Sequence, residues 1–139
     1  MRQVILIVDD EVEICDTIQS VLALWGVESR SFYDAESALA ALTPIHGDRS
    51  VLRHGTDQAA SLVCGALLDL NLPNLSGLEL GERFHVMGMG IPFSLMTAAM
   101  LDGDVEMRIA ALRAGLLRKP FELLELKAAV DRFRKDLSL

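Results

Sequence analysis

The stretch SLVCGALLDLNLPNLSG, residues 61–77, decides how this chain folds. Its apolar run, residues 62–68, ends abruptly in the carboxylate of Asp69. A continuous Val/Leu/Ala/Cys run of this length predicts a strand buried on both faces. The Asn, Pro, Ser and Gly residues that follow predict a loop leading into a helix. Asp69 is therefore expected at the carboxyl end of an interior strand, the edge of an open α/β sheet where ligands bind.

Composition restricts the class of protein. With 139 residues, 51% of them apolar and 24% charged, the chain predicts one globular domain with a substantial core. A net charge of −7 argues against direct nucleic acid binding by this domain, because a phosphate backbone requires a basic face. The sequence has no signal peptide and no apolar segment of membrane length, so no membrane association is expected. Two cysteines in apolar surroundings, Cys15 and Cys64, favour a reduced, cytoplasmic location.

Four more strands are predicted around the central one. They cover Gln3–Val8 and residues 27–33, 91–96 and 116–118. Helical patterns follow all five strands, over residues 10–25, 34–42, 76–87, 102–114 and from 120 onward. Five strands that alternate with five helices predict a doubly wound α/β fold with a parallel sheet in the order 2-1-3-4-5.

Helix ends are predicted from capping residues. Asp10 is expected to cap the first helix and Asp34 the second. Pro120 is expected at the first position of the last helix, where proline is favoured. Met87, in the third helix, and Leu123, in the last, are expected to face the core.

Residues 43–60, TPIHGDRSVLRHGTDQAA, do not fit this alternation. The segment is polar, contains Pro44, Gly47 and Gly55, and has no sustained period. It predicts a surface loop, with at most one short helical turn after Thr56. Residues 1–139 are then expected to form one domain with an insertion at about 43–61 between the second helix and the third strand.

Five polar residues fall at the carboxyl ends of the predicted strands: Asp9, Asp10, Asp69, Thr97 and Lys119. Three neighbouring carboxylates raise one another's pKa, and a divalent cation such as Mg²⁺ relieves that repulsion. Asp69 could then attack phosphorus and form an acyl phosphate. Lys119 and Thr97 would supply a positive charge and a hydroxyl donor to the transferred group.

Each residue also has a simpler interpretation. Asp9 and Asp10 could be capping acids, Asp69 a turn residue, Thr97 an ordinary strand residue and Lys119 a surface lysine. Their joint occurrence at one sheet edge favours a site. Flavin or nucleotide binding by the same fold is disfavoured, because acids rather than a glycine-rich phosphate cradle follow the first strand.

Four motifs in this order resemble the receiver domain of response regulators in two-component signalling. They are VDDE (residues 8–11), LLDLNLPNLSG (67–77), MTA (96–98) and RKPF (118–121), and the match covers essentially the whole chain. The resemblance implies a flavodoxin-like fold. It also implies that Asp69 is the phosphoacceptor and a ligand of Mg²⁺. Asp10 would bind the ion directly, Asp9 through water, and Asn71 through its main-chain carbonyl.

The resemblance further implies a switch. A sensor histidine kinase or a phosphotransfer protein would donate the phosphoryl group, Thr97 would be the switch hydroxyl, and Lys119 would bind the phosphoryl group. The Lys119–Pro120 bond is expected to be cis. The domain would catalyse only its own phosphorylation and dephosphorylation, and it would change binding at the face of the fourth helix, fifth strand and fifth helix. An output domain, an effector protein and a second copy are the candidate partners.

Two features depart from the family pattern. Leu116 stands where the family usually has an aromatic residue that reports the switch, and the segment 43–61 is longer than the usual connection. An alternative function follows from them: a phosphorylation-independent interaction module that uses the insertion and the altered face.

Overall fold

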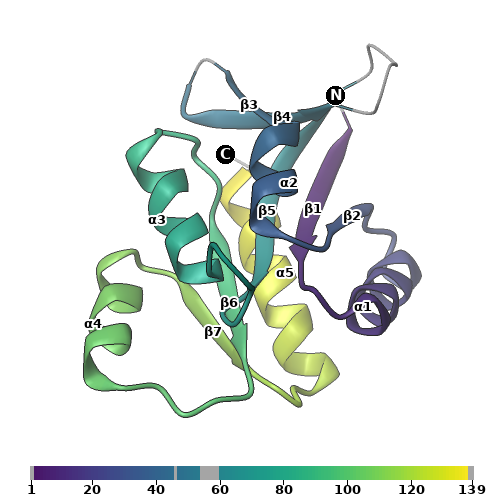
Figure 1. Cartoon of the computed structure of the whole chain (residues 1–139). Helices are drawn as coiled ribbons and strands as arrows, with labels where there is room; N and C mark the ends of the chain where they lie inside the picture. Colours follow the sequence, from purple (N-terminus) through teal and green to yellow (C-terminus); the bar gives the residue numbers. More distant parts are fainter. Residues whose placement is uncertain (1, 46, 54–59, 138–139) are drawn as a thin grey trace.

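The computed structural model describes residues 2–45, 47–53 and 60–137. In this part of the chain one sheet is flanked by helices (Figure 1). Its strands are β1 (Gln3–Val8), β2 (Ser29–Phe32), β3 (Leu42–Ile45), β4 (Arg49–Arg53), β5 (Ala60–Asp69), β6 (Phe93–Thr97) and β7 (Gly115–Arg118). The helices are α1 (Val12–Leu24), α2 (Ala35–Ala41), α3 (Gly77–Val86), α4 (Gly103–Ala111) and α5 (Leu123–Leu137).

The parallel part of the sheet has the predicted topology. Its strands lie in the order β2-β1-β5-β6-β7, and every neighbouring pair among them is parallel. This is the order 2-1-3-4-5 when the five parallel strands are numbered along the chain. The doubly wound α/β fold is therefore confirmed.

Helices cover both faces of the sheet. The core on one face receives α2, α3 and α4, whereas the other core receives α1 and α5 (Figure 1). Strand β1 supplies both: Leu6 and Val8 belong to the first core, and Ile5 and Ile7 to the second. A strand buried on both faces needs apolar residues at successive positions, which explains why β1 and β5 read as unbroken apolar runs.

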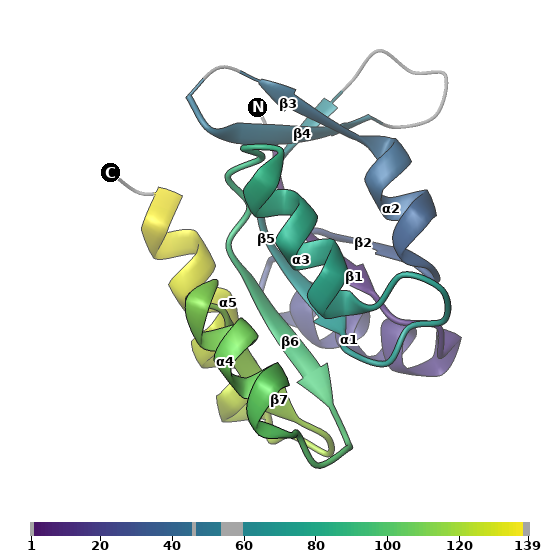
Figure 2. The same ribbon diagram turned by 60° about the vertical axis from the view of Figure 1, so that its left-hand side comes forward.

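The prediction of a surface loop over residues 43–60 is wrong for the described part of that segment. Strands β3 and β4 form an antiparallel hairpin, and β4 pairs antiparallel with the first residues of β5, with Val51 opposite Leu62. The hairpin therefore extends the sheet (Figure 2). The helical turn expected after Thr56 lies outside the described residues.

An irregularity in β5 explains where the hairpin fits. Val4 pairs with Val63 but Ile5 pairs with Gly65, so β5 has one extra residue at this point, a β-bulge. Beyond the bulge β5 pairs with β6, and before it with β4. The hairpin thus covers the part of the β5 edge that the shorter β6 leaves unpaired, which protects backbone groups that would otherwise be exposed.

Several predicted helix ends differ from the structure. Glu11, not Asp10, is the N-cap of α1, and its side chain makes no capping hydrogen bond. The Glu11 N–H donates to the Asp9 carboxylate. Helix α5 begins at Leu123 rather than at Pro120, and its first backbone bonds run to the carbonyl of Glu122. The cap at Asp34 is confirmed.

Two side chains expected in the core are instead exposed. Met87 is 50% exposed because α3 ends before it, and Leu123 is 61% exposed on the first turn of α5. In the described residues no helix combines the length and apolar character needed to cross a bilayer.

Candidate functional site

Four of the predicted site residues stand at strand ends. Asp69 and Thr97 are the last residues of β5 and β6, while Asp9 and Lys119 directly follow β1 and β7. The parallel register brings these ends together, since Val8 lies opposite Leu68, Asp69 opposite Met96, and Thr97 opposite Arg118. Asp10 follows Asp9 in the loop to α1.

Lys119 lies between two buried carboxylates. Its Nζ is 2.7 Å from Oδ2 of Asp9 and 3.7 Å from Oδ2 of Asp69. Asp9 is fully buried and Asp69 is 4% exposed. The backbone fixes the base of the lysine, because its N–H donates to the carbonyl of Thr97 at 2.7 Å. The ammonium group is therefore held at the meeting point of β1, β5 and β6.

The electrostatics of Asp69 reflect this crowding. Burial raises the pKa of Asp69, and the negative charge of Asp9 raises it further. The hydrogen bond from the Asn71 N–H and the positive charge of Lys119 lower this pKa, but they do not cancel the rise. Burial alone would lower the pKa of Lys119. The hydrogen bond that Lys119 donates to Asp9 and the charges of both aspartates outweigh burial and raise the pKa of Lys119. Lys119 is thus a cation, but it does not fully neutralise its acidic neighbours.

The acidic cluster suits a divalent cation. One carboxylate oxygen from each of Asp9, Asp10 and Asp69 lies within 4.8 Å of the other two. Lys119 pairs with Asp9 and Asp69, and Asp10 adds a third carboxylate, so negative charge is in excess. An all-oxygen donor set with excess negative charge is what Mg²⁺ binds in proteins. The side chains therefore fit the predicted metal, whereas the role of the Asn71 carbonyl stays a prediction.

A hydrogen-bonded chain joins Thr97 to Asp69. The Thr97 hydroxyl accepts the Ala99 N–H at 3.0 Å and the Asn71 side-chain amide at 3.5 Å. The Asn71 backbone N–H in turn donates to Oδ1 of Asp69 at 3.1 Å. The structure thus brings Thr97 into the same network as the acids. The predicted cis bond at Lys119–Pro120 is present.

Two residues around the site were not foreseen. The thiol of Cys15 donates to the main-chain carbonyl of Asp9 at 3.3 Å, which ties α1 to the end of β1. A Cβ on Gly77 would collide with the Asp69 carbonyl, so only glycine lets α3 begin this close to the end of β5. In the sequence, a glycine directly after Ser76, the residue that caps α3, was the sign that the helix starts close to other backbone.

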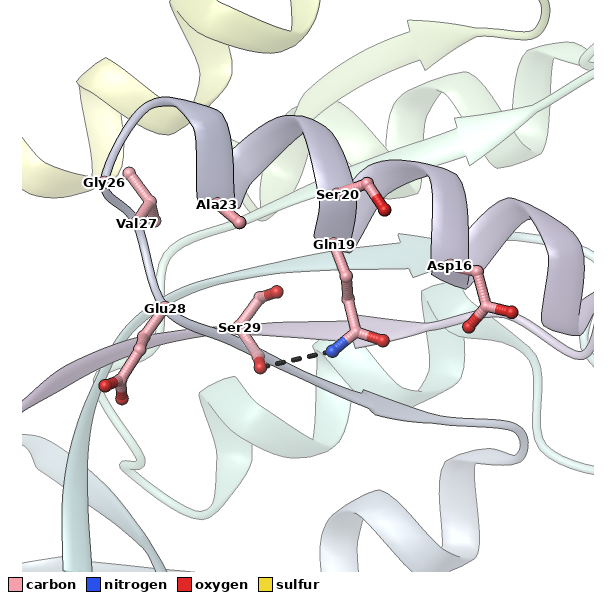
Figure 3. Close-up of a pocket in the computed structure, with 8 residues that line it drawn as sticks. All are labelled: Asp16, Gln19, Ser20, Ala23, Gly26, Val27, Glu28 and Ser29. Atoms are coloured by element: carbon pink, nitrogen blue, oxygen red, sulfur yellow. Dashed lines mark hydrogen bonds between the residues drawn. The ribbon is translucent and has the colours of Figure 1, made fainter.

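A hollow of about 660 Å³ lies elsewhere, between α1 and the β2 edge (Figure 3). Gln19 reaches across it, donating to the Ser29 carbonyl at 3.3 Å and accepting from the Ser31 hydroxyl at 2.8 Å. Its charged residues are the acids Asp16 and Glu28. The hollow offers no nucleophile paired with a base or a cation, so the strand-end cluster is the better candidate for chemistry.

The chain is similar to known proteins over most of its length. The response regulator receiver domain family matches residues 5–131. The transcriptional regulatory protein PrrA of Mycobacterium tuberculosis is 30% identical over 129 residues, which is 91% of this chain and 47% of PrrA. The response regulator protein TmoT of Ectopseudomonas mendocina is 27% identical over 133 residues, covering 93% of this chain and 51% of TmoT. The chain therefore spans about half the length of these curated relatives.

Solved structures share the fold. A response regulator receiver protein from Pseudoalteromonas atlantica superposes with a TM-score of 0.75 at 20% identity, over 97% of this chain and 99% of that one. A CheY-like receiver domain protein from Methanospirillum hungatei gives 0.72 at 24% identity, over 98% and 99%. Since the family match spans most of the sequence and the fold agrees with it, this chain belongs to the response regulator receiver domain family.

Proposed function

We propose that this receiver domain is a phosphorylation-activated switch that accepts a phosphoryl group on Asp69 with the help of Mg²⁺. The observation that carries the proposal is the Lys119 ammonium, 2.7 Å from Asp9 and 3.7 Å from Asp69, within a cluster of three carboxylates. In this proposal residues 1–139 form one receiver domain, and the segment of about residues 43–61 is an insertion between α2 and β5.

The proposed chemistry is transfer from a phosphohistidine. An Asp69 carboxylate oxygen attacks phosphorus, the P–N bond breaks, and the imidazole leaves with a proton taken from solvent. Lys119 binds the oxygens of the transferred group, and its charge stabilises them as they become more negative. Asp10 would hold Mg²⁺ directly, Asp9 through water, and Asn71 through its carbonyl. When bound, the ion supplies further charge neutralisation. The domain acts on itself and on no metabolite.

The switch is proposed to start at Thr97. Its hydroxyl now accepts the Ala99 N–H, and turning it to donate to a phosphoryl oxygen would release the β6–α4 loop. Helix α4 is suited to respond, because Ile109 is its one buried residue and it is joined to α3 by a partly exposed ion pair, Arg108–Glu82. The α4–β7–α5 face, where Leu116 is 36% exposed, would then change its affinity for a partner.

The partners follow from this reaction. A sensor histidine kinase or a phosphotransfer protein would donate the phosphoryl group. An output domain, an effector protein or a second copy of the chain would respond to it. PrrA is named a transcriptional regulatory protein, and this chain matches about half of its length. This supports an output domain as one of the candidate partners.

Intact-mass measurement tests the proposal. Wild-type protein incubated with acetyl phosphate and Mg²⁺ should gain one phosphoryl group, and it should gain none when EDTA replaces Mg²⁺. Asp69→Asn keeps the size of the side chain but removes the nucleophile, so it should gain none in either buffer. Wild type and Asp69→Asn that behave alike would refute the proposal.

The hairpin β3–β4 favours one second candidate, a phosphorylation-independent interaction module. The hairpin is an ordered part of the sheet. Its residue Ser50 is fully buried, and the Ser50 hydroxyl donates to the Met89 carbonyl at 2.7 Å. This candidate predicts a partner whose binding ignores both the Asp69→Asn substitution and Mg²⁺.

A further inference from the structure

A groove of about 640 Å³ lies where β6 and β7 begin, at the end of the sheet opposite the acidic site. The loop after α3, the turn after α4, and α5 form its walls, and Asp48 of the hairpin turn reaches its edge. In Figure 2 β6 starts between α3 and α5 on the side of the hairpin, and its arrowhead points to the far end of the molecule. The groove is therefore separate from Asp69.

Two arginines from different elements line this groove. Arg113 comes from the turn after α4 and Arg132 from α5. Neither side chain forms a hydrogen bond or an ion pair within the described part of the chain. Among the described lining residues Asp48 is the one acid. A protein of net charge −7 thus places two arginines at one hollow.

The backbone beside each arginine is unusual. A Cβ on Gly115 would collide with the Ser94 hydroxyl and would lie 3.1 Å from Nη1 of Arg132. The Arg132 guanidinium therefore packs beside the backbone of Gly115, where no side chain separates them. Arg113, in the turn after α4, has a φ of 56°, a left-handed conformation that is usually taken by glycine just after a helix. The chain therefore retains an arginine where the backbone favours glycine.

Apolar groups form the rest of the wall. Phe93 packs edge-on against Phe84, with ring centroids 6.1 Å apart. The ring of Phe93 fits because Gly81 has no Cβ, and that of Phe133 fits against Gly65 for the same reason. These rings are at most 9% exposed and back the groove from the core. The half-buried Pro92, Leu112 and Ala114 are the apolar lining that a ligand would contact.

We propose that this groove binds a small organic anion that joins a carboxylate or phosphate to a flat apolar ring. A guanidinium group binds such anions through two parallel hydrogen bonds, and the apolar wall accepts the ring. The volume lies within the roughly 300–1,000 Å³ of small-molecule sites. Charge complementarity selects the anion, because an acidic protein repels anions from most of its remaining surface.

An NMR titration of the ¹⁵N-labelled chain with 2-naphthoate tests this assignment. The amide shifts should cluster at residues 88–91, 93 and 113–115, and 2-naphthamide, the uncharged analogue, should bind much more weakly. Arg132→Gln and Arg113→Gln should each weaken 2-naphthoate binding by about tenfold, because each removes a charge-assisted hydrogen bond. Arg83→Gln removes the same charge from the exposed side of α3 outside the groove, and it should bind like wild type.

Other outcomes would overturn the proposal. Equal binding of naphthoate and naphthamide would remove the role of charge. An equal loss in Arg83→Gln and Arg132→Gln would show general charge attraction. Shifts centred on Asp69 and Lys119 would place the anion at the acidic site. Displacement of naphthoate by far lower concentrations of a glutamate-rich peptide would make the groove a protein-docking surface. Unchanged amide spectra of the free variants would establish that each one folds.

Discussion

Lys119 holds together a site whose other ionisable groups repel each other. Its ammonium is the one basic group paired with the buried Asp9 among the described residues, and it also faces Asp69. Removing one partner of a buried ion pair leaves the other charge desolvated and unpaired, which costs more than the pair itself contributes.

Lys119→Met should therefore lower the free energy of unfolding by roughly 3 kcal/mol in metal-free buffer. Added MgCl₂ should stabilise the variant more than wild type, because the cation takes over part of the neutralisation. Urea unfolding with EDTA or MgCl₂ measures both effects. Lys127→Met is the control, since its ion pair with Asp131 is exposed and its loss should cost no more than about 1 kcal/mol. Equal losses in the two variants would contradict the account.

The two cysteines offer a second check at the same scale. Burial raises the pKa of the Cys64 thiol to about 11, and burial also raises the pKa of Cys15. Because the thiolate is the reactive form, neither should react with an alkylating reagent at pH 8 while the chain is folded. Both should react once urea unfolds it. Rapid labelling of either cysteine in native buffer would show that the described packing is wrong.

Among the elements, the hairpin β3–β4 is the main addition to the parallel sheet. Two contacts fix it to the loop after α3: the Ser50 hydrogen bond to Met89, and the close approach of the Asp48 carbonyl to Gly90. This loop leads into β6, which ends at Thr97. The hairpin is thus packed against the loop that leads into the strand carrying the proposed switch hydroxyl.

Gly90→Ala and Gly88→Ala separate this contact from backbone strain. Both glycines have nearly equal positive φ, 64° and 63°, so alanine is strained at either position by about 1 kcal/mol. A Cβ at Gly90 would also collide with the Asp48 carbonyl, whereas a Cβ at Gly88 meets nothing within 4 Å. Thermal or urea unfolding should find Gly90→Ala less stable than Gly88→Ala by about 1–3 kcal/mol. Equal stabilities would mean that the hairpin does not pack on this loop.

For the molecule as a whole, the sequence predicts the parallel sheet well because each interior strand is an apolar run that stops at a polar residue. The end of β5 at Asp69 and the end of β6 at Thr97 follow directly from that pattern. Since parallel strands meet at one edge, the grouping of the acids with Lys119 follows as well.

The hairpin could not be predicted in this way. Its strands have four and five residues, Pro44 lies in one of them, and β4 pairs with the part of β5 that precedes the bulge between Val63 and Gly65. Such pairing depends on contacts between segments and not on a local period. The N-cap of α1 was predicted one residue early, at Asp10, because an acid is a good cap by residue type, whereas the helix starts one residue later and has no side-chain cap. The groove arginines carry no sequence motif, and only the fold brings them together.

The most direct test of the proposed switch is to identify the residue that carries the phosphoryl group. Borohydride reduces an aspartyl phosphate to homoserine, which peptide mass spectrometry can locate after treatment with acetyl phosphate. We expect homoserine at position 69 when Mg²⁺ is present, and unmodified aspartate at positions 9 and 10. Homoserine at position 9 or 10, or none anywhere in protein that remains folded, would contradict the account.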